Sequence, residues 1–367
     1  MKARGVHLQY HFESGGQNGA TVHNPLFDLL GAVHEHGSIQ RAAQALGASY
    51  RHVWGQLRHW QDVLGEPIVH WTQGQPARLT PFAERLLWAE AHARARLTPH
   101  IEALRGELEH VLAEALDGSQ QVLTLVASHD LALPALRDCA RDHERLHIDL
   151  RFAGSLDALR ALAEGRCTVA GFHVPPLPEG SALFARSLKS LLKPGRHKLI
   201  GCSHRTQGLM VAPGNPLALT GLAAAVFARA RFARRQPGSA TWLLTQHLLA
   251  QAELQIDLHS VRTEDSHSAV AAAVAGGMAD AGIGLEAAAH AFGLHFVPLA
   301  GDDYFLVCLA QALEQPAVQA LRRALNHDAW RQAVAALPGY AVAQPGQVLS
   351  LTGALPWWHF RSKRPPA

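Results

Sequence analysis

The hydrophobic positions of the chain follow a helical spacing in its first third and a mixed spacing thereafter. Three helices are predicted first, because apolar residues recur every three to four positions and the runs are broken at Gly37 and Gly47. Ser38 and Ser49 precede the second and third runs, where a serine caps a helix N-terminus. The segments PIVHW and ARLT then read as two short strands, and GVHLQYHF, at residues 5–12, alternates as a strand in the same way.

A helical pattern of over thirty residues begins at Pro81 and runs to about Leu116. An apolar row along it would stay partly exposed if the N-terminal domain occurred as a monomer, so this helix is predicted to pair two protomers. The row consists of Leu86, Leu87, Leu97, Ile101, Leu104, Leu108 and Leu112. The alternative is a long helix that packs only on its own chain.

Strand-like runs alternate with helical ones after Ser119, which predicts βα units around largely parallel sheets. The strand-like runs are 122–127, 147–152, 168–172, 199–203 and 209–211. Four polar or glycine-containing turns each lead into a predicted helix, and helix N-termini at the carboxyl ends of strands favour anions. These turns supply the predicted ligand-binding residues Ser128, His129, Asp130, Ser155, Arg235, Gly238, Ser239, Thr241, Ser266 and His267. For any single turn, ordinary N-capping is the simpler interpretation.

The first three helices and the hairpin have the order of a winged helix-turn-helix, and the alternative is a three-helix interaction bundle. The small residues Ala42 and Ala43 permit a close approach of helices, and Val53 and Leu57 are predicted to face inward. The net charge is only +3, but no Asp or Glu occurs between His36 and Gln61, so a local cationic patch is present. The predicted DNA-binding residues are Ser38, Arg41, Ser49, Tyr50, Arg51, His52, Arg58 and Arg78.

Composition narrows the class of protein. With 48% hydrophobic and 17% charged residues, the chain of 367 residues is not largely disordered. It has no run of about twenty apolar residues, so no membrane span is predicted. Its first residues lack the apolar stretch of a signal peptide, which predicts a cytoplasmic protein.

Cysteine and histidine positions indicate no cofactor. Four cysteines lie far apart without a CxxC pair and are predicted to be buried, inert thiols; they are Cys139, Cys167, Cys202 and Cys308. His143 and His147 have the i, i+4 spacing that can hold a metal on one helix face. Their polar surroundings favour a solvated helix face instead, and no metal or catalytic residue is predicted.

Two motifs within Pro25–Trp88, GSIQRAAQALGASYRHVWGQL and LTPFAERLL, resemble a known DNA-binding domain. It is the N-terminal domain of the molybdate-dependent ModE-type regulators, and the motifs are similar, more loosely, to LysR-type regulators. In those families the long helix that follows pairs two protomers. The resemblance therefore implies a dimer that binds double-stranded operator DNA.

A second set of motifs resembles the periplasmic-binding-protein-like domain that is found fused to helix-turn-helix modules or to molybdopterin-biosynthesis proteins. The motifs are LVASHDLAL, FAGSLDALRALAEGRCTVAGFHVP, RTQGLMVAPGNPL, FARRQPGSATWLL and DSHSAVAAAVAGGMADAGIGLEAAA. The family is molybdate- or tungstate-linked, and it implies two lobes, a cleft between them and a return crossover near Asp303–Leu309. Where relatives often have NRQxGSGTR, this chain has Arg234, Ala240 and Trp242 in place of Asn, Gly and Arg, so its ligand pocket is expected to differ.

The predicted fold class is therefore α/β, with an α-rich N-terminal winged helix-turn-helix and a C-terminal two-lobed, periplasmic-binding-protein-like α/β domain. The predicted parts are a DNA-binding domain (1–80), a linker and dimerisation helix (81–118), a ligand-binding domain (119–345) and a tail without a fold signal (346–367).

The predicted function is a one-component transcription regulator, not an enzyme, that acts as a homodimer or a dimer of dimers. Its effector is expected to be a small anion, molybdate or tungstate first, bound between the lobes. One alternative is a LysR-like regulator that senses a small organic acid, because Arg235 can grip a carboxylate bidentately. Another alternative is a binding protein of molybdenum-cofactor metabolism.

Overall fold

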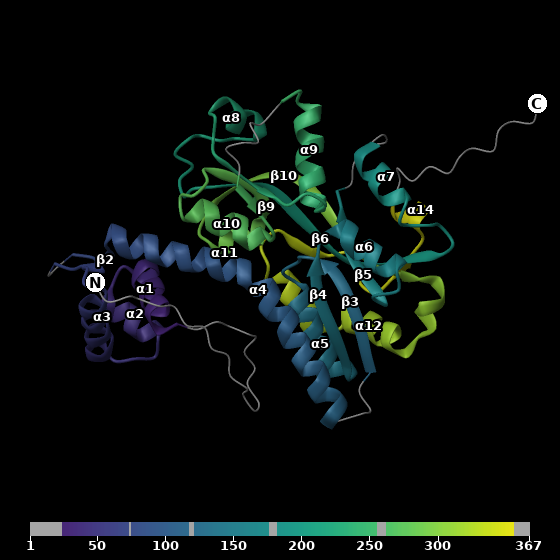
Figure 1. The fold of residues 1–367 in the computed structure, drawn as a ribbon, viewed down its shortest axis with the longest axis horizontal. Helices are drawn as coiled ribbons and strands as arrows, with labels where there is room; N and C mark the ends of the chain where they lie inside the picture. Colours follow the sequence, from purple (N-terminus) through teal and green to yellow (C-terminus); the bar gives the residue numbers. More distant parts are fainter. Residues whose placement is uncertain (1–23, 73–74, 117–120, 176–181, 255–261, 356–367) are drawn as a thin grey trace, which may run out of the picture. The chain divides into compact units, whose positions relative to one another are not determined.

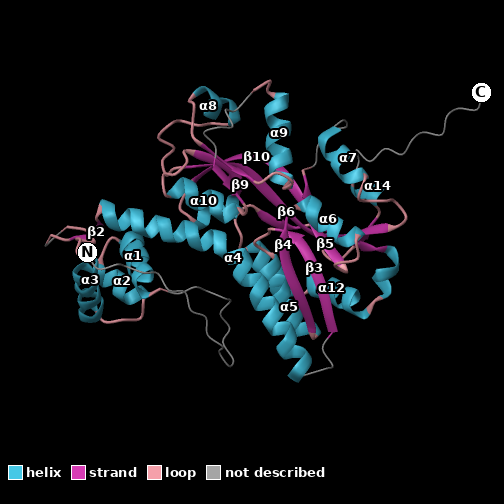
Figure 2. Cartoon of the chain, in the orientation of Figure 1, coloured by secondary structure: helices cyan, strands magenta, loops and turns pink. Residues whose placement is uncertain are grey.

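The computed structural model describes residues 24–72, 75–116, 121–175, 182–254 and 262–355 of the chain. It consists of two compact units, Met1–Arg94 and Ala95–Ala367. Figure 1 follows the chain through both units, and Figure 2 distinguishes helices from strands. The strand predicted at residues 5–12 lies outside the described residues.

The first unit has the predicted order of three helices and a short antiparallel hairpin. Asn24 caps the first helix by accepting the N–H of Leu26 at 3.0 Å, and Gly37 ends it with a φ of 57°. The elements are α1 (Pro25–His36), α2 (Ile39–Ala45), α3 (Tyr50–Leu64), β1 (Val69–His70) and β2 (Arg78–Leu79). Val53 and Leu57, which were predicted to face inward, are buried, and so are Ala42 and Ala43, which were predicted to permit a close approach of helices.

Helix α4 (Pro81–Leu116) begins in the first unit and continues into the second. Pro99 lies inside it, where proline removes one backbone hydrogen bond and bends a helix. Leu87 packs in the core of the first unit, whereas Leu97, Leu104 and Val111 are 39%, 48% and 61% exposed. The side chain of Leu112, the last member of the predicted row, lies outside the described residues.

The second unit is built on one ten-stranded sheet. The strand order is β4-β3-β5-β10-β6-β9-β7-β8, and β11 and β12 also pair with β6. The strands are β3 (Gln121–Ser128), β4 (Leu146–Ala153), β5 (Val169–Val174), β6 (His197–Val211), β7 (Phe232–Arg235), β8 (Arg262–Glu264), β9 (Ala281–Leu285), β10 (His295–Leu309), β11 (Tyr340–Val342) and β12 (Val348–Leu349).

The sheet is mixed, so the expectation of largely parallel sheets is wrong. Strands β6 and β10 are 15 residues long each and run antiparallel to one another. They separate two parallel groups, β4-β3-β5 and β9-β7-β8, which we call the first and second lobes. The predicted strands at 199–203 and 209–211 are both parts of β6, and between them Arg205 and Gln207 are buried within the strand.

Helices cover the sheet and form the cores of both lobes with it (Figure 2). They are α5 (Leu133–Glu144), α6 (Ser155–Ala163), α7 (Ala182–Lys189), α8 (Leu222–Phe227), α9 (Ala240–Gln251), α10 (His267–Ala275), α11 (Glu286–Ala291), the 3-10 helix η2 (Ala310–Glu314), α12 (Pro316–Asn326), α13 (Asp328–Ala335) and α14 (Leu351–Ala354). None of the helices that are described is both long enough and apolar enough to cross a membrane.

The end of the chain corrects another prediction. Residues 346–355 are not a tail without structure, because β12 pairs with β6 and α14 packs on the core. Leu351 and Leu355 are buried there, and apolar burial holds this segment in place. The last residues of the predicted tail, 356–367, lie outside the described residues.

His143 and His147 do not share a helix face. Helix α5 ends at Glu144 and is followed by Arg145 at a φ of 50°, so His147 lies on strand β4 and is buried. The solvated-face interpretation holds for His143 alone, whose side chain is exposed. The prediction of buried thiols is confirmed, because all four cysteines are free and buried.

Candidate functional site

Four helices of the second unit begin where parallel strands end. In the first lobe Ser128, the last residue of β3, lies opposite Ala153, the last residue of β4. In the second lobe Arg235 of β7 lies opposite Glu264 of β8. Helices α5, α6, α9 and α10 follow these four strand ends, which places all four predicted turns at the carboxyl edges of the sheet.

The turns of the two lobes meet. A Cβ atom added to Gly154, before α6, would lie 3.2 Å from the carbonyl oxygen of Gly238, before α9. His129, before α5, and His267, at the start of α10, have ring centroids 6.4 Å apart. The tertiary structure therefore brings the predicted ligand-binding residues of both lobes into one polar cluster.

Three predicted hydroxyls in this cluster already have partners. Ser239 Oγ accepts the N–H of Trp242 at 3.1 Å and donates to the Gln236 carbonyl at 2.9 Å. Ser266 Oγ accepts the N–H of Ala269 at 3.0 Å, and Ser128 Oγ donates to the Tyr304 hydroxyl at 3.3 Å. Ordinary N-capping accounts for the first two of these residues.

Other buried polar atoms of the cluster have no hydrogen-bond partner among the described residues. They are the hydroxyl oxygens of Ser155 and Thr241, Nδ1 of His129 and both ring nitrogens of His267. Ser155 and Thr241 lie in the first turns of α6 and α9, where free backbone N–H groups and the helix dipole favour negative charge. Buried polar groups without partners are uncommon in proteins, so this set is suited to a ligand that supplies the missing bonds.

The two histidines of the cluster are neutral near pH 7. Burial, with the guanidinium groups of Arg235 and Arg205 acting in the same direction, lowers the pKa of His129 to about 3. The same causes, burial first, hold the pKa of His267 well below 6.5. A neutral imidazole offers one N–H donor and one acceptor, so both rings can donate to an anion without carrying charge.

Arg235 supplies a positive charge at the edge of the second lobe. It is 5% exposed, and its guanidinium donates to the backbone oxygen of Asp265 at 2.7 Å and to Gln236 Oε1 at 3.3 Å. Burial lowers its pKa to about 10, against the opposing effect of Asp265, so it remains protonated at neutral pH.

A second buried cation, Arg205, was missed in the sequence. It lies on β6 directly opposite Asp302 of β10, and it is completely buried. Its guanidinium donates to Asp302 and, at 2.7 Å, to Asp130 Oδ2, and it stacks on the Tyr304 ring at 4.9 Å. Asp130 Oδ1 in turn accepts the N–H of Ala132 at 2.8 Å, so Arg205 anchors the turn that carries His129.

Gln207 and His173 complete this charged network. Gln207 Nε2 donates to Asp302 Oδ2 at 2.8 Å, and His173 Nδ1 lies 3.0 Å from Asp302 Oδ1. The available sequence signal was Arg205 and Gln207 at alternate positions of a short polar segment between two apolar runs. Residues two apart share one face of a strand, and a charged residue there needs a buried partner.

The predicted DNA-binding residues gather around the start of α3 and on the hairpin. Ser49 caps α3 by accepting the N–H of His52 at 3.2 Å, and it leaves Tyr50 and Arg51 exposed. Tyr50 stacks on Trp54 with ring centroids 6.5 Å apart, and Arg58 lies over the same indole at 5.4 Å. These contacts hold aromatic and cationic groups side by side on one exposed surface of the helix.

Of the remaining members, Ser38 is half-buried, and Arg41 and Arg78 are exposed. Ser38 caps α2 by accepting the N–H of Arg41 at 3.4 Å, and the Arg41 side chain is solvent-accessible. Arg78 is exposed on β2, opposite His70 of β1.

Two protein families match the chain. The family model described as PBP superfamily domain matches residues 136–326, which is just over half of the chain. The model described as bacterial regulatory helix-turn-helix protein, lysR family, matches residues 26–84. The second is a family of DNA-binding regulators and not of enzymes.

Two relatives are similar over parts of their length. "Uncharacterized protein YvgK" of Bacillus subtilis (strain 168) is 28% identical over 208 residues, which is 54% of this chain and 64% of that protein. "Molybdenum-pterin-binding protein MopB" of Rhodobacter capsulatus is 30% identical over 120 residues, or 32% of this chain and 42% of that protein. The chain thus spans less than two thirds of the length of either relative.

Solved structures of similar chain length also match. Full-length BenM is 15% identical, with a TM-score of 0.43, and covers 84% of this chain and 96% of its own. Full-length LysG from Corynebacterium glutamicum with bound effector Arg is 18% identical, with a TM-score of 0.41, and covers 84% and 99%. From the family matches, the chain belongs to the PBP superfamily, and it joins this type of ligand-binding domain to a lysR-family helix-turn-helix, which is the composition of a LysR-type transcription regulator.

Proposed function

We propose that this protein regulates transcription by binding operator DNA through α3 and by sensing a small oxyanion, molybdate or tungstate first, between its lobes. The proposed binding of an oxyanion rests on one observation: buried polar atoms of Ser155, Thr241, His129 and His267 have no hydrogen-bond partner among the described residues. They belong to elements of both lobes, so a ligand that bonds to all of them bridges the lobes. A ligand that favours the closed arrangement shifts the population of a two-lobed domain toward it.

The chemistry of the cluster favours an oxyanion over a cation or an apolar ligand. Hydroxyl groups, neutral imidazoles and helix N-termini are all donors, and donors surround an anion without an equal counter-charge. Arg235 adds one cation, while the charge of Arg205 is offset by Asp130 and Asp302. The name of the relative MopB, a molybdenum-pterin-binding protein, supports molybdate or tungstate as the first oxyanions to test.

An organic acid remains the second candidate effector. The buried guanidinium of Arg235 favours it, because guanidinium binds a planar carboxylate through two parallel hydrogen bonds. In that case Arg235 dominates the affinity, and the hydroxyls of Ser155 and Thr241 contribute less.

The proposal includes a homodimer formed along α4. Its residues Leu97, Leu104 and Val111 recur every seven positions and are exposed, with the less exposed Ile101 and Leu108 between them. Such a seam at heptad spacing is typical of two helices that pair. The division into a DNA-binding domain (1–80), a linker helix (81–118) and a ligand-binding domain from residue 119 is part of the same proposal.

Thr241→Val is expected to separate ligand binding from folding. Valine has nearly the same shape but no hydroxyl, so it removes a buried group that has no hydrogen-bond partner among the described residues. The melting temperature without ligand should stay the same or rise, because an unsatisfied buried hydroxyl costs free energy. Affinity for molybdate or tungstate should fall by about 10- to 100-fold, as loss of one hydrogen bond to a charged group predicts.

Ser155→Ala should behave in the same way. Thr352→Val, at an exposed position of α14, is the matched control, and it should change neither the melting temperature nor the affinity for the oxyanion. Isothermal titration calorimetry and thermal unfolding of the full chain measure both effects. Binding of a small carboxylate that is lost in Arg235→Gln, with no heat from either oxyanion, would favour the organic-acid candidate and contradict the oxyanion proposal.

Arg51→Ala and Arg41→Ala are expected to weaken DNA binding in different ways. If Arg51 contacts a base edge, its loss should reduce affinity for the operator by about 1–3 kcal/mol and relax the sequence preference. Loss of a phosphate contact by Arg41 should weaken all sequences similarly and reduce the salt dependence of binding. Gel shifts at several salt concentrations, on a duplex selected from a random pool by the wild-type protein, distinguish the two.

Arg231→Ala, an exposed arginine of the second unit, is the control for that experiment. Unchanged operator affinity in both Arg51→Ala and Arg41→Ala would contradict the assignment of α3 as the recognition helix.

A further inference from the structure

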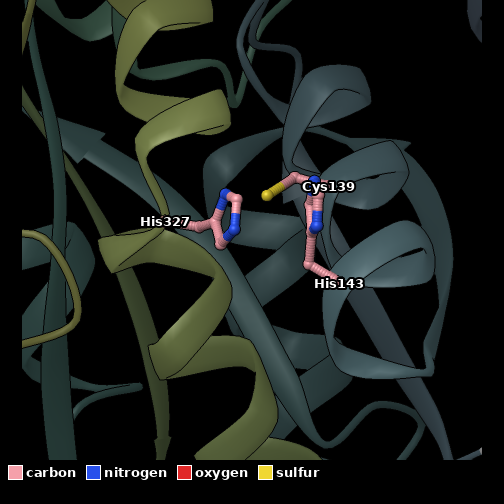
Figure 3. Close-up of side chains that lie close together, drawn as sticks. All are labelled: Cys139, His143 and His327. Carbon is pink, nitrogen blue, oxygen red and sulfur yellow. The ribbon is translucent and has the colours of Figure 1, made fainter.

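A cysteine and two histidines converge in the first lobe, away from the polar cluster described above (Figure 3). Cys139 and His143 lie four residues apart on α5, so both side chains are on one face of that helix. His327 lies at the junction of α12 and α13 and faces them. One ligand atom from each of the three residues lies within 4.8 Å of the other two.

The donor set matches a soft or borderline transition metal. Thiolate sulphur and imidazole nitrogen bind zinc at about 2.3 and 2.0–2.1 Å, which brings tetrahedral ligand atoms to within roughly 4 Å of one another. Small side-chain movements would therefore close this cluster around an ion. Hard cations such as magnesium and calcium prefer oxygen ligands, and the cluster offers none.

The surroundings define which atoms are available. His327 Nδ1 accepts the N–H of Ala329 at 3.2 Å and caps α13, so Nε2 is its free nitrogen. The Cys139 thiol donates weakly to the Ala324 carbonyl at 3.8 Å. Burial raises the pKa of this thiol, and the carboxylates of Asp142 and Glu144 raise it further, so a metal that binds there displaces the thiol proton.

We propose that Cys139, His143 and His327 form a binding site for a transition-metal ion, with zinc as its representative and a fourth position left for water or an exogenous ligand. The rings of His143 and His327 are stacked with centroids 3.9 Å apart and planes at 16°. A metal lies in the plane of each ring that binds it, so the exposed ring of His143 turns out of the stack on binding. The ion would then join α5 to the start of α13 within the first lobe.

Cobalt(II), a spectroscopic substitute for zinc, tests the site in the full-length protein. One equivalent should produce a thiolate-to-cobalt absorption band, and zinc should displace it. The same zinc concentration should raise the melting temperature, whereas magnesium should not. X-ray absorption of the zinc-loaded protein should show one sulphur and two imidazole nitrogens in the coordination sphere.

Single substitutions test each ligand. Cys139→Ala should abolish the band, and His143→Gln should lower cobalt affinity by at least about 100-fold, the upper end of what loss of a ligand's own hydrogen-bond partner costs. His327→Asn should do the same while its side-chain oxygen still caps α13. Cys167→Ala and His290→Gln, which alter a buried cysteine and an exposed histidine elsewhere, should leave binding unchanged.

Absence of the cobalt band in the wild-type protein would overturn the proposal. So would a band or a zinc-induced thermal shift that persists at full strength in His143→Gln and His327→Asn, because binding would then lie elsewhere among the 24 histidines.

Discussion

Replacing Arg205 with methionine is expected to lower the free energy of unfolding by about 3–5 kcal/mol, as removal of one partner of a buried ion pair does. The guanidinium is completely buried and bonds to both Asp130 and Asp302. Burial alone would raise the pKa of Asp302, but Arg205 holds it well below its ordinary value, so Asp302 is ionised in the folded protein. Without Arg205, two buried carboxylates lose their counter-charge.

Urea unfolding of the full chain measures this effect, and Arg231→Ala provides a matched loss of an exposed arginine. Its pair with Asp280 is half exposed and solvent-screened, so that change should cost only about 0–1 kcal/mol. Adding Asp302→Asn to Arg205→Met should restore part of the lost stability, because it removes one uncompensated charge. Equal effects of Arg205→Met and Arg231→Ala would show that the buried network does not stabilise the fold.

Acidification is expected to lower the free energy of unfolding already at pH values well above those at which carboxylates titrate. The pKa of His129 falls from 6.5 to about 3 on folding, and that of His267 falls well below 6.5. Below pH 6.5 the unfolded chain therefore binds protons that the folded chain does not, and stability falls as pH falls. The shift of His129 should cost about 2 kcal/mol between about pH 7 and about pH 5, and the shift of His267 acts in the same direction.

Urea titrations at several pH values within that range test this dependence. The variant His267→Phe should flatten it, because one of the histidines that bind a proton in the unfolded chain but stay neutral in the folded chain is removed. His290→Gln replaces an exposed histidine on α11 and should leave the slope as it is. A slope that is the same in wild type and His267→Phe would show that His267 is not kept neutral by burial.

The helices and turns of the first unit were predicted well from the sequence, because the signals that define them act between residues close together in the chain. Helical spacing, the caps Ser38 and Ser49 and the turn at Gly47 all act within a few residues of themselves. The inward-facing residues Val53 and Leu57 follow from the same periodicity. The fold class of the second unit also followed from alternating strand and helix signals.

Only part of the candidate site could be predicted from the sequence. Turns after strands were recognisable as potential anion sites, and the structure does gather them. Which hydroxyls are free was not recognisable, because it depends on where each helix begins. Ser239 is the N-cap residue of α9 and bonds to the backbone, whereas Ser155 lies one position inside α6, after the N-cap Gly154. The proposed metal cluster was missed because His143 was paired with His147 by spacing, whereas its neighbours in space are Cys139 and His327.

The helix-turn-helix, the α/β class of the second unit and the positions of the polar turns all follow from the amino-acid sequence. These features depend on backbone conformation and on periodicity, both of which are local. Long-range contacts, in contrast, make β6 and β10 continuous antiparallel strands, place Arg205 opposite Asp302, and bring the turns of two lobes together at Gly154 and Gly238. Those contacts join residues far apart in the chain, and their free energy arises when both partners are buried together.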